Sequence, residues 1–299
     1  MALGRRVFVV GARTLIQGMF EHVLIATDGS DCGMRAARAG VELAATYDAT
    51  ATVVVAAAGE LSEADAASVV EDVAEVGASS RVTVQTRVAT QKPRVAILEA
   101  ADDVDADVIA MGRHGHTNLE ERFLGSVTER VLRATDRPVL TVTGQGSGLG
   151  EYEDVLVTSD GSDAARRAVR PGVSLASTYD AVLHVLSVVD VAFEAGPFNA
   201  GGVDEAYVDR LVADAERELD VFAAACEERS RDDAIDIEQA VRTGAPSAEI
   251  AAYVEDAGVD LVAMASTGEG SLAGQLLGST AGRVLRSVDV PVLVVPGRN

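Results

Sequence analysis

Lysine is almost absent from this sequence. Lys92 is the single lysine, so nearly all of the 25 basic residues are arginines, and they face 47 acidic residues in a chain of formal net charge −22. Such a surface repels phosphate backbones and anionic lipid headgroups, so we expect no sequence-independent binding to nucleic acid or to a membrane. The excess of carboxylates favours adaptation to high salt, where screening tolerates self-repulsion. A GC-rich genome that encodes acidic proteins is the alternative account of this composition.

Cysteine is nearly as scarce as lysine. Cys32 and Cys226 are the two in the chain, one in each half. They give no disulfide framework, so we expect a reducing cytoplasm as the setting. Cys32 lies just ahead of an expected helix, which would lower the pKa of its thiol. The favoured alternative is a small, partly buried residue.

The first 18 residues have no counterpart elsewhere in the chain. Arg5 and Arg6 precede an apolar run, as in a twin-arginine export signal, but the run stops at Arg13 and no small-x-small cleavage site follows. Met19 directly precedes the first repeated segment, so an over-extended start is the simplest account. We expect residues 1–18 to be a disordered or weakly attached N-terminal tail.

Several catalytic signatures are also missing. The chain has no Gly-x4-Gly-Lys-Ser/Thr loop, and Lys92 is not placed to replace the lysine of such a loop. No Ser-His-Asp or Cys-His arrangement stands at a recognisable spacing. His114 and His116 suggest a metal, but they lack a third ligand at a suitable spacing, so phosphate contact or exposure to solvent is favoured. His184 falls in an apolar strand and is expected in the core or a cleft.

What the chain does contain is an internal repeat. Its length of 299 residues, with 48% hydrophobic residues, suits two globular domains of about 140 residues each. Thr-Tyr-Asp-Ala occurs at 46–49 and 178–181, at an offset of 132 residues, and the blocks 123–142 and 276–295 share 12 of 20 residues at an offset of 153. The rise from 132 to 153 places an insert of about 21 residues in the second copy.

The repeat and its insert define the expected domains. The first domain covers residues 19–143, a flexible linker covers 144–150, and the second domain covers 151–299. Within the insert, residues 195–202 read as a flexible loop, and a longer helix follows over 204–228.

Each copy alternates short apolar strands with helices, which implies a parallel sheet covered by helices on both faces. The strands expected in the first copy begin at residue 23 and then cover 51–58, 81–88, 107–111 and the Val-Leu-x-Val segment 139–142. The helices expected between them cover 34–46, 62–76, the segment from Pro93 to 101, and 127–134. In the second copy, strands begin at 155 and cover 182–189, 235–241 and 292–295, and a helix starts near Pro246 and ends near 257. The third strands alternate enough to be half-exposed.

The segment after the fourth strand carries the functional signal. Gly112 and Gly115 remove side chains where the backbone must bend and where a ligand could approach closely. Nine residues later, Gly125 precedes Ser126, which is suited to cap the following helix. Exposed N–H groups and the positive helix end at that point favour a phosphate.

The second copy repeats this spacing with changes that weaken it. Ala265 replaces the first glycine and would cost about 1–2 kcal/mol if the backbone there were left-handed. Glu269 adds negative charge where the first copy offers Arg113 and two histidines. The first copy is therefore predicted to be the better site for an anion.

The spacing Gly-x2-Gly-x9-Gly-Ser after such a strand resembles the nucleotide loop of the universal stress protein family. The resemblance covers residues 19–297 as two tandem copies. It implies an α/β fold of two doubly wound parallel five-stranded sheets, with strand order 3-2-1-4-5, similar to adenine nucleotide alpha-hydrolases. In that order, strands one and four flank the switch point where ligands bind, so the Asp28 turn and the Gly112 loop would face each other.

The resemblance also implies binding residues. Asp28 would lie near the adenine or ribose, although an Asx-turn and helix cap is an alternative and compatible role. Gln91 stands where the second copy has Gly244, at a turn where the family usually has glycine. This difference weakens the assignment of ribose-binding residues in the first copy. The implied residues of the first copy are Ala26, Thr27, Asp28, Ala56, Met111, Gly112, Gly115, Gly125, Ser126, Val127 and Thr128. Those of the second copy are Thr158, Ser159, Asp160, Val188, Met264, Ala265, Gly268, Gly278, Ser279 and Thr280.

By this resemblance, we expect a cytoplasmic, ATP-binding regulatory protein of the stress response that lacks efficient catalysis. Its ligand would be an adenine nucleotide, ATP alone or with Mg²⁺ or Mn²⁺. A slow metal-dependent ATPase and an interaction scaffold that binds no nucleotide are the alternatives. The apolar fifth strands would form sheet edges, so we expect the copies to pair as an internal pseudo-dimer, with self-pairing between chains as the alternative. A homodimer and a protein partner that the sequence does not identify are further expectations.

Overall fold

The computed structural model describes residues 19–58, 61–115, 124–144, 150–191, 205–230, 235–268 and 277–297. Strands and helices alternate through both copies, as the sequence predicts. The first copy contains β1 (His22–Ala26), α1 (Asp31–Tyr47), β2 (Thr50–Ala56), α2 (Glu63–Ser79), β3 (Val84–Ala89), α3 (Pro93–Asp103), β4 (Val108–Gly112), α4 (Ser126–Leu132) and β5 (Val139–Val142). The second contains β6 (Asp154–Ser159), the 3-10 helix η1 (Ala165–Ala168), α5 (Val169–Tyr179), β7 (Val182–Val189), α7 (Glu205–Arg229), β8 (Ile237–Thr243), α8 (Pro246–Ala257), β9 (Leu261–Ala265), α9 (Ser279–Ser287) and β10 (Val292–Val295).

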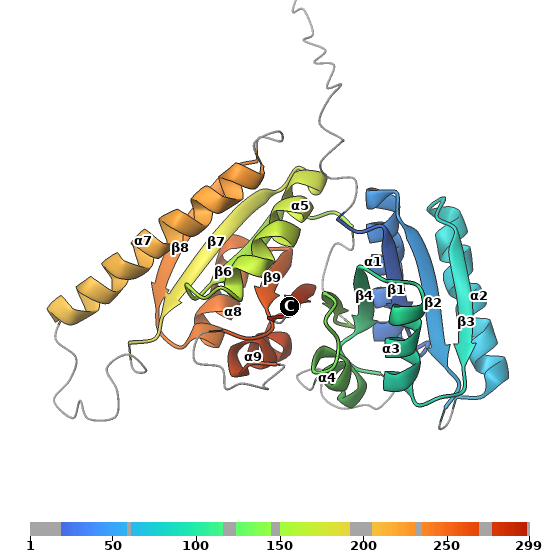
Figure 1. The fold of residues 1–299 in the computed structure, drawn as a ribbon. Coiled ribbons are helices and arrows are strands. Elements are labelled where there is room, and N and C mark those ends of the chain that lie inside the picture. The colour runs from blue at the N-terminus through green and yellow to red at the C-terminus, as the bar shows by residue number, and fades with distance from the viewer. Residues whose placement is uncertain are drawn as a thin grey trace, which may run out of the picture.

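The ten strands form one sheet in the order β3-β2-β1-β4-β5-β10-β9-β6-β7-β8. Each copy thus has the order 3-2-1-4-5, which confirms the predicted topology. Helices α1, α2, α5 and α7 pack against one hydrophobic core, and α3, α4, α8 and α9 pack against the other (Figure 1). Because the central parallel strands are buried on both faces, their sequences are almost continuously apolar. The outer strands β3 and β8 are largely half-exposed or exposed, as their alternation predicts.

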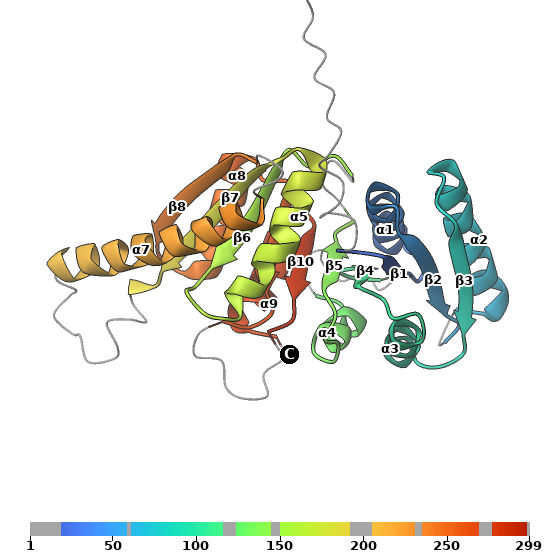
Figure 2. The same ribbon diagram turned by 45° about the horizontal axis from the view of Figure 1, so that its top comes forward.

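The two copies meet through their fifth strands. β5 and β10 lie side by side (Figure 2) and pair antiparallel. In this register Leu140 lies opposite Leu293. The Thr141 hydroxyl also donates to the Val292 carbonyl at 3.1 Å. This pairing confirms the expected association within the chain, and it covers two apolar edges that would otherwise be open to another strand.

The repeated Thr-Tyr-Asp-Ala segment has a structural role at the same junction. Asp48 and Asp180 end α1 and α5 in left-handed backbone conformation, with φ of 54° and 56°. Aspartate tolerates this conformation better than most residues. The tyrosines before them pack edge to face on Phe20 and Tyr152, and the Tyr47 hydroxyl lies 2.9 Å from the Ser174 hydroxyl of the other copy.

The first helix differs between the copies. α1 is continuous, whereas the second copy begins with η1 and becomes α-helical at Val169. Pro171 has no N–H, and its ring crowds the carbonyl of Arg167 four residues earlier. The equivalent residue of α1 is Ala39, which permits an unbroken helix.

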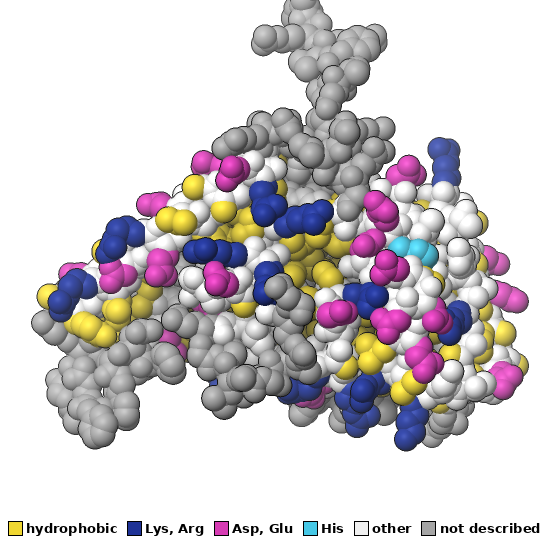
Figure 3. Space-filling model, viewed as in Figure 1, with side chains coloured by type: hydrophobic (Ala, Val, Ile, Leu, Met, Phe, Trp, Pro, Cys, Tyr) yellow, Lys and Arg dark blue, Asp and Glu magenta, His cyan; other side chains and the backbone are white. Residues whose placement is uncertain are grey.

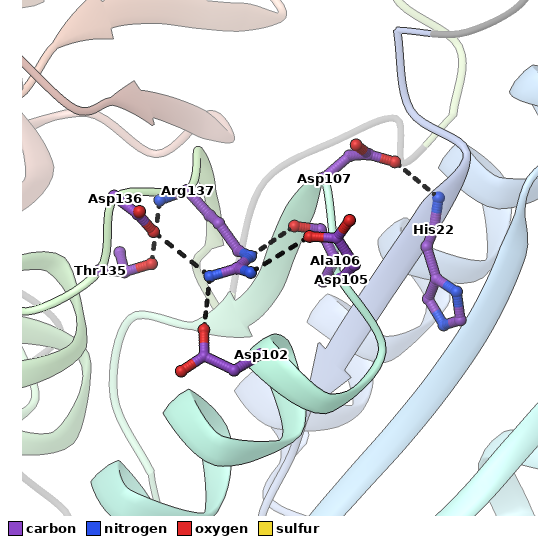
Figure 4. Close-up of polar contacts among 8 residues, drawn as sticks. All are labelled: His22, Asp102, Asp105, Ala106, Asp107, Thr135, Asp136 and Arg137. Atoms are coloured by element: carbon purple, nitrogen blue, oxygen red, sulfur yellow. Dashed lines mark hydrogen bonds and ion pairs between the residues drawn. The ribbon is translucent and has the colours of Figure 1, made fainter. Parts of the chain in front are cut away.

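Arginine supplies counter-ions among the many carboxylates. Figure 4 shows Arg137 between the α3–β4 and α4–β5 connections. Its Nε donates to the Ala106 carbonyl at 2.7 Å, and its guanidinium lies 2.8–3.5 Å from carboxylate oxygens of three aspartates, which are Asp102, Asp105 and Asp136. One guanidinium therefore holds together two loops that are rich in negative charge.

Three predicted segments lie outside the described residues: the tail 1–18, the inserted loop 195–202, and residues 145–149 of the linker. Among the described helices, none combines the length and apolar character needed to cross a membrane. The face shown in Figure 3 carries acidic side chains on both halves with arginines among them.

Candidate functional site

The carboxyl ends of β1 and β4 lie side by side in the first copy. Ala26 pairs with Met111, and both are buried. From these neighbouring strand ends, the chain turns into the Asp28 turn on one side and into the Gly112–Gly115 loop on the other. β2 pairs along the other side of β1 and ends at Ala56. The predicted switch point is therefore formed at this edge of the sheet.

Asp28 shapes the turn after β1. Its Oδ1 accepts hydrogen bonds from the Ser30 N–H at 3.1 Å and the Ser30 hydroxyl at 2.5 Å, which confirms the Asx-turn. The cap of α1 is Ser30 and not Asp28, because the Ser30 hydroxyl accepts from the Gly33 N–H. Asp28 is therefore held by the turn while its second carboxylate oxygen points at the glycine loop.

Close packing explains the three glycines of the loop. Gly112, Gly115 and Gly125 all have ordinary negative φ, so none is needed for a left-handed backbone. A Cβ at Gly115 would lie 2.2 Å from Asp28 Oδ2, and a Cβ at Gly112 would lie 3.0 Å from the Cys32 sulfur. The loop, the Asp28 turn and the first turn of α1 thus approach more closely than side chains would allow.

The helix after the loop starts at a different residue from the one predicted. α4 begins at Ser126, and its N-cap is Gly125, whose N–H donates to the Arg113 carbonyl at 2.7 Å. A Cβ at Gly125 would lie 2.9 Å from that carbonyl oxygen, so glycine is required for this approach. Ser126 is exposed as the first helical residue. α9 begins in the same way after Gly278.

The threonines of the site support its backbone. The Thr128 hydroxyl donates to the Gly112 carbonyl at 2.8 Å, and the Thr27 hydroxyl accepts from the Gly29 N–H at 3.2 Å. Of the residues implied for the first copy, Ala26, Thr27, Met111 and Thr128 are buried, Ser126 is exposed, and Asp28, Ala56, Gly112, Gly115, Gly125 and Val127 are partly exposed. The structure brings the turn, loop and helix-start residues to one edge.

The second copy repeats this arrangement in a looser form. Asp160 makes the same turn, and a Cβ at Gly268 would lie 2.1 Å from Asp160 Oδ2. Ala265 has ordinary negative φ, so the strain expected for a left-handed residue does not arise. Pairing of β6 with β9 stops at Val157 and Ala263, one pair earlier than in the first copy. Of the implied residues, Ser159 and Met264 are buried, Asp160 and Ser279 are exposed, and Thr158, Val188, Ala265, Gly268, Gly278 and Thr280 are partly exposed.

A hollow of about 480 Å³ adjoins the second copy's turn and was not predicted from the sequence. It is lined by Ser159, Gly161 and Arg166 and, on α7, by Asp214, Arg217, Glu218, Val221 and Phe222. Glu218 packs against Gly161, where Val69 packs against Gly29 in the first copy. The sequence did predict a longer helix at this position of the second copy, and this was the signal that the surface beside the turn would differ from that of the first copy.

Arg113 lies in the glycine loop but does not face the crevice, so its predicted place beside a phosphate is wrong. Its side chain crosses the junction and is 2% exposed. The guanidinium donates to the carbonyls of Leu285, Val288 and Val290 in the second copy. Burial lowers its pKa to about 10, which leaves it positively charged at neutral pH.

His114 and His116 of the loop were predicted to contact a phosphate or to be exposed to solvent. His114 is partly buried, and its Nε2 has no hydrogen-bond partner within the described part of the chain. His116 and Glu269 lie outside the described residues.

Burial determines the direction of the pKa shift of both cysteine thiols. It raises the pKa of the Cys32 thiol, so the predicted lowering by the helix start is wrong and the small buried residue is confirmed. The Cys32 thiol donates to the Val142 carbonyl at 3.1 Å. Burial also raises the pKa of Cys226 to about 12.

His184 is a core residue, as predicted. Its Nδ1 lies 2.9 Å from the Tyr253 hydroxyl, and its Nε2 lies 2.8 Å from Asp154 Oδ1. Asp154 begins β6, so this polar cluster lies at the opposite end of the strand from the glycine loop.

Comparisons with known proteins agree with this geometry. The family model described as the universal stress protein family matches residues 19–143 and 151–296. A universal stress protein of Methanocaldococcus jannaschii is 31% identical over 149 residues, which are 50% of this chain and 85% of the relative. One of Mycobacterium tuberculosis is 27% identical over 224 residues, covering 73% of this chain and 71% of the relative. The crystal structure of a universal stress protein from Archaeoglobus fulgidus aligns with a TM-score of 0.70 at 22% identity, over 94% of this chain and 97% of that chain. The chain therefore belongs to the universal stress protein family, with two copies of the domain in tandem.

Proposed function

We propose that this protein binds an adenine nucleotide, ATP, as a regulatory protein of the stress response, without efficient turnover. The observation that carries the proposal is the close approach of the Asp28 turn, the Gly112–Gly115 loop and the Gly125 helix start. Three separate segments meet so closely that the glycine positions have no room for a side chain, at the edge of the sheet where α/β proteins bind ligands.

The groups present at this edge fit the parts of an adenine nucleotide. The Asp28 carboxylate and the end of β2 at Ala56 supply acceptors and backbone groups for the adenosine. The N–H groups at the start of α4 and the exposed Ser126 hydroxyl suit the phosphates. Gly112 and Gly115 let the loop backbone lie against the Asp28 turn and the start of α1, so that these segments can contact one ligand together.

Binding without efficient turnover is favoured by the fate of Arg113. Phosphoryl transfer relies on cations that neutralise developing charge on the transferred group. The Arg113 guanidinium donates to carbonyls of the second copy, so it does not reach the crevice. A bound divalent ion would supply such charge, and a slow metal-dependent ATPase is the outcome that the experiment below must separate.

The test uses the full chain. Native mass spectrometry of the purified protein should show a bound adenine nucleotide, and calorimetry should show ATP binding with Mg²⁺ or Mn²⁺. Gly115→Val should abolish most binding in the first copy, because the added side chain meets Asp28. Ala78→Val is the control, because it adds a side chain of the same kind at an exposed position near the end of α2.

Two outcomes would change the proposal. A chain that carries no nucleotide and gives no heat with ATP, with or without a divalent ion, would contradict nucleotide binding. Such a result favours an interaction scaffold. Metal-dependent phosphate release that disappears in Gly125→Val would instead favour the ATPase.

A further inference from the structure

Arg113 is anchored in three directions. Its N–H donates to the Val142 carbonyl of β5 at 2.8 Å, and its carbonyl accepts from the Gly125 N–H at 2.7 Å. These two bonds fix the glycine loop between β5 and the start of α4. Its side chain forms the third anchor in the other copy, on the carbonyls of Leu285, Val288 and Val290.

The third anchor is a strong one. The guanidinium is buried, and two of its three carbonyl partners, Leu285 and Val288, lie at the C-terminal end of α9, where the helix dipole favours a cation. Its Nε also points to the Thr141 hydroxyl at 3.3 Å, and that hydroxyl donates to Val292. A buried guanidinium deprived of these acceptors would be unpaired, so the side chain cannot swing away without a large penalty.

We propose that Arg113 is a positioning residue for nucleotide binding in the first copy. The docked α9–β10 segment of the second copy holds the Arg113 side chain, and through its backbone Arg113 holds the Gly112–Gly115 loop and the Gly125 cap. The first site is therefore completed by the second copy. This inference rests on the proposed nucleotide function.

The side-chain anchor has no reciprocal at the equivalent position of the second copy, where the backbone bonds to Val295 and Gly278 are kept. Ser266 occupies the position equivalent to Arg113, and its hydroxyl accepts from the Gly297 N–H at 3.0 Å within its own copy. The connection in the first copy that corresponds to residues 285–290 is held by Arg137 and the aspartates of the first copy (Figure 4). Completion therefore runs in one direction, from the second copy to the first site.

The test compares matched arginine variants in a full chain whose second site is blocked by Gly268→Val. In that background, Arg113→Met should weaken ATP binding to the first site about tenfold, and Arg113→Lys should weaken it less. Arg137→Met removes an arginine that contacts only its own copy in the described structure, and it should change the affinity by less than twofold. Unchanged affinity in Arg113→Met would overturn the inference alone, whereas a parent that binds no ATP would overturn the proposed function as well.

Two further readouts separate positioning from general destabilisation. With the first site blocked by Gly115→Val, Arg113→Met should leave the affinity of the second site within twofold, and an equal loss at both sites would overturn the inference. With Arg113 intact and Gly268→Val present, ATP should slow hydrogen exchange across residues 285–292 of the second copy. A chain that binds ATP without this protection would also overturn it.

Discussion

Leu140 lies opposite Leu293 in the antiparallel pair of β5 and β10, and the two are equivalent positions of the repeat. The pseudo-two-fold axis that relates the copies therefore passes between them. Both are almost fully buried, at 3% and 1% exposure, and both line a small apolar cavity of about 10 Å³ together with Phe20 and Tyr152. The centre of the molecule is thus a core to which both copies contribute, and the copies are not independent domains joined only by a linker.

A charge at this pair should disrupt the junction. Leu140→Asp and Leu293→Asp each bury a carboxylate without a partner, so we expect losses of several kcal/mol in the free energy of unfolding. Val221→Asp, at a position 61% exposed on α7, should change the stability by less than about 0.5 kcal/mol. Denaturant unfolding measures both effects. Wild-type stability in both leucine variants, with two separated lobes in small-angle scattering, would show that the junction does not hold in solution.

The two candidate sites should differ in affinity. In the first copy the Arg113 side chain anchors the loop to the other copy and β1 pairs with β4 up to the crevice, whereas the second copy lacks both features. Calorimetry should therefore show that Gly115→Val removes more ATP binding than Gly268→Val, although both added side chains meet the facing aspartate. Equal losses in the two variants would refute this ranking.

Alkaline pH should weaken the junction. Burial raises the pKa of Tyr47 to about 12, and it also raises the pKa values of Tyr152 and Tyr179. A tyrosine whose pKa is higher in the folded state stabilises the fold fully below its unfolded pKa near 10, and this contribution falls as the pH rises toward 12. For Tyr47 alone, the shift amounts to about 2–3 kcal/mol across that window.

Urea unfolding between pH 9 and pH 11.5 measures this effect. Tyr47→Phe should flatten the decline above pH 10, while Tyr207→Phe on α7 should leave it unchanged. Curves that remain parallel for all three proteins would contradict the assignment to Tyr47.

The protein should lose stability in dilute salt. At net charge −22, self-repulsion acts over a Debye length of about 30 Å at 0.01 M salt but only about 3 Å at 1 M. The melting temperature should therefore rise from dilute to molar KCl. Arg137→Met should steepen this rise, because Asp102, Asp105 and Asp136 would then repel one another. A melting temperature independent of salt would contradict adaptation to high salt.

The fold could be predicted because its signals are local or repeated. Apolar runs of strand length, the two Thr-Tyr-Asp-Ala segments and the glycine spacing do not depend on distant contacts. Pro93 and Pro246 each begin a helix, as their fixed φ predicts. The pairing of β5 with β10 could also be expected, since an apolar edge of the same composition occurs twice in one chain.

The details that could not be predicted depend on packing between segments distant in sequence. The direction of the Arg113 side chain is set by carbonyls more than 170 residues away in the chain. The pKa of Cys32 depends on burial beneath the glycine loop, which outweighs the helix start. The N-cap of α4 is Gly125 and not Ser126, because the Gly125 N–H donates to the Arg113 carbonyl across the loop. By contrast, Pro171 was a visible signal for the broken helix start in the second copy.

Fusion of the two copies has a consequence for how this protein can diverge. In a dimer of identical chains, one codon specifies both sides of the two-fold interface, so every substitution appears twice. Here the positions of Arg113 and Ser266 are encoded separately, and a long cation enters the interface from one side alone. In a tandem chain the two halves can therefore evolve separately. One half can be selected for ligand binding, while the other is selected as a structural support for that site.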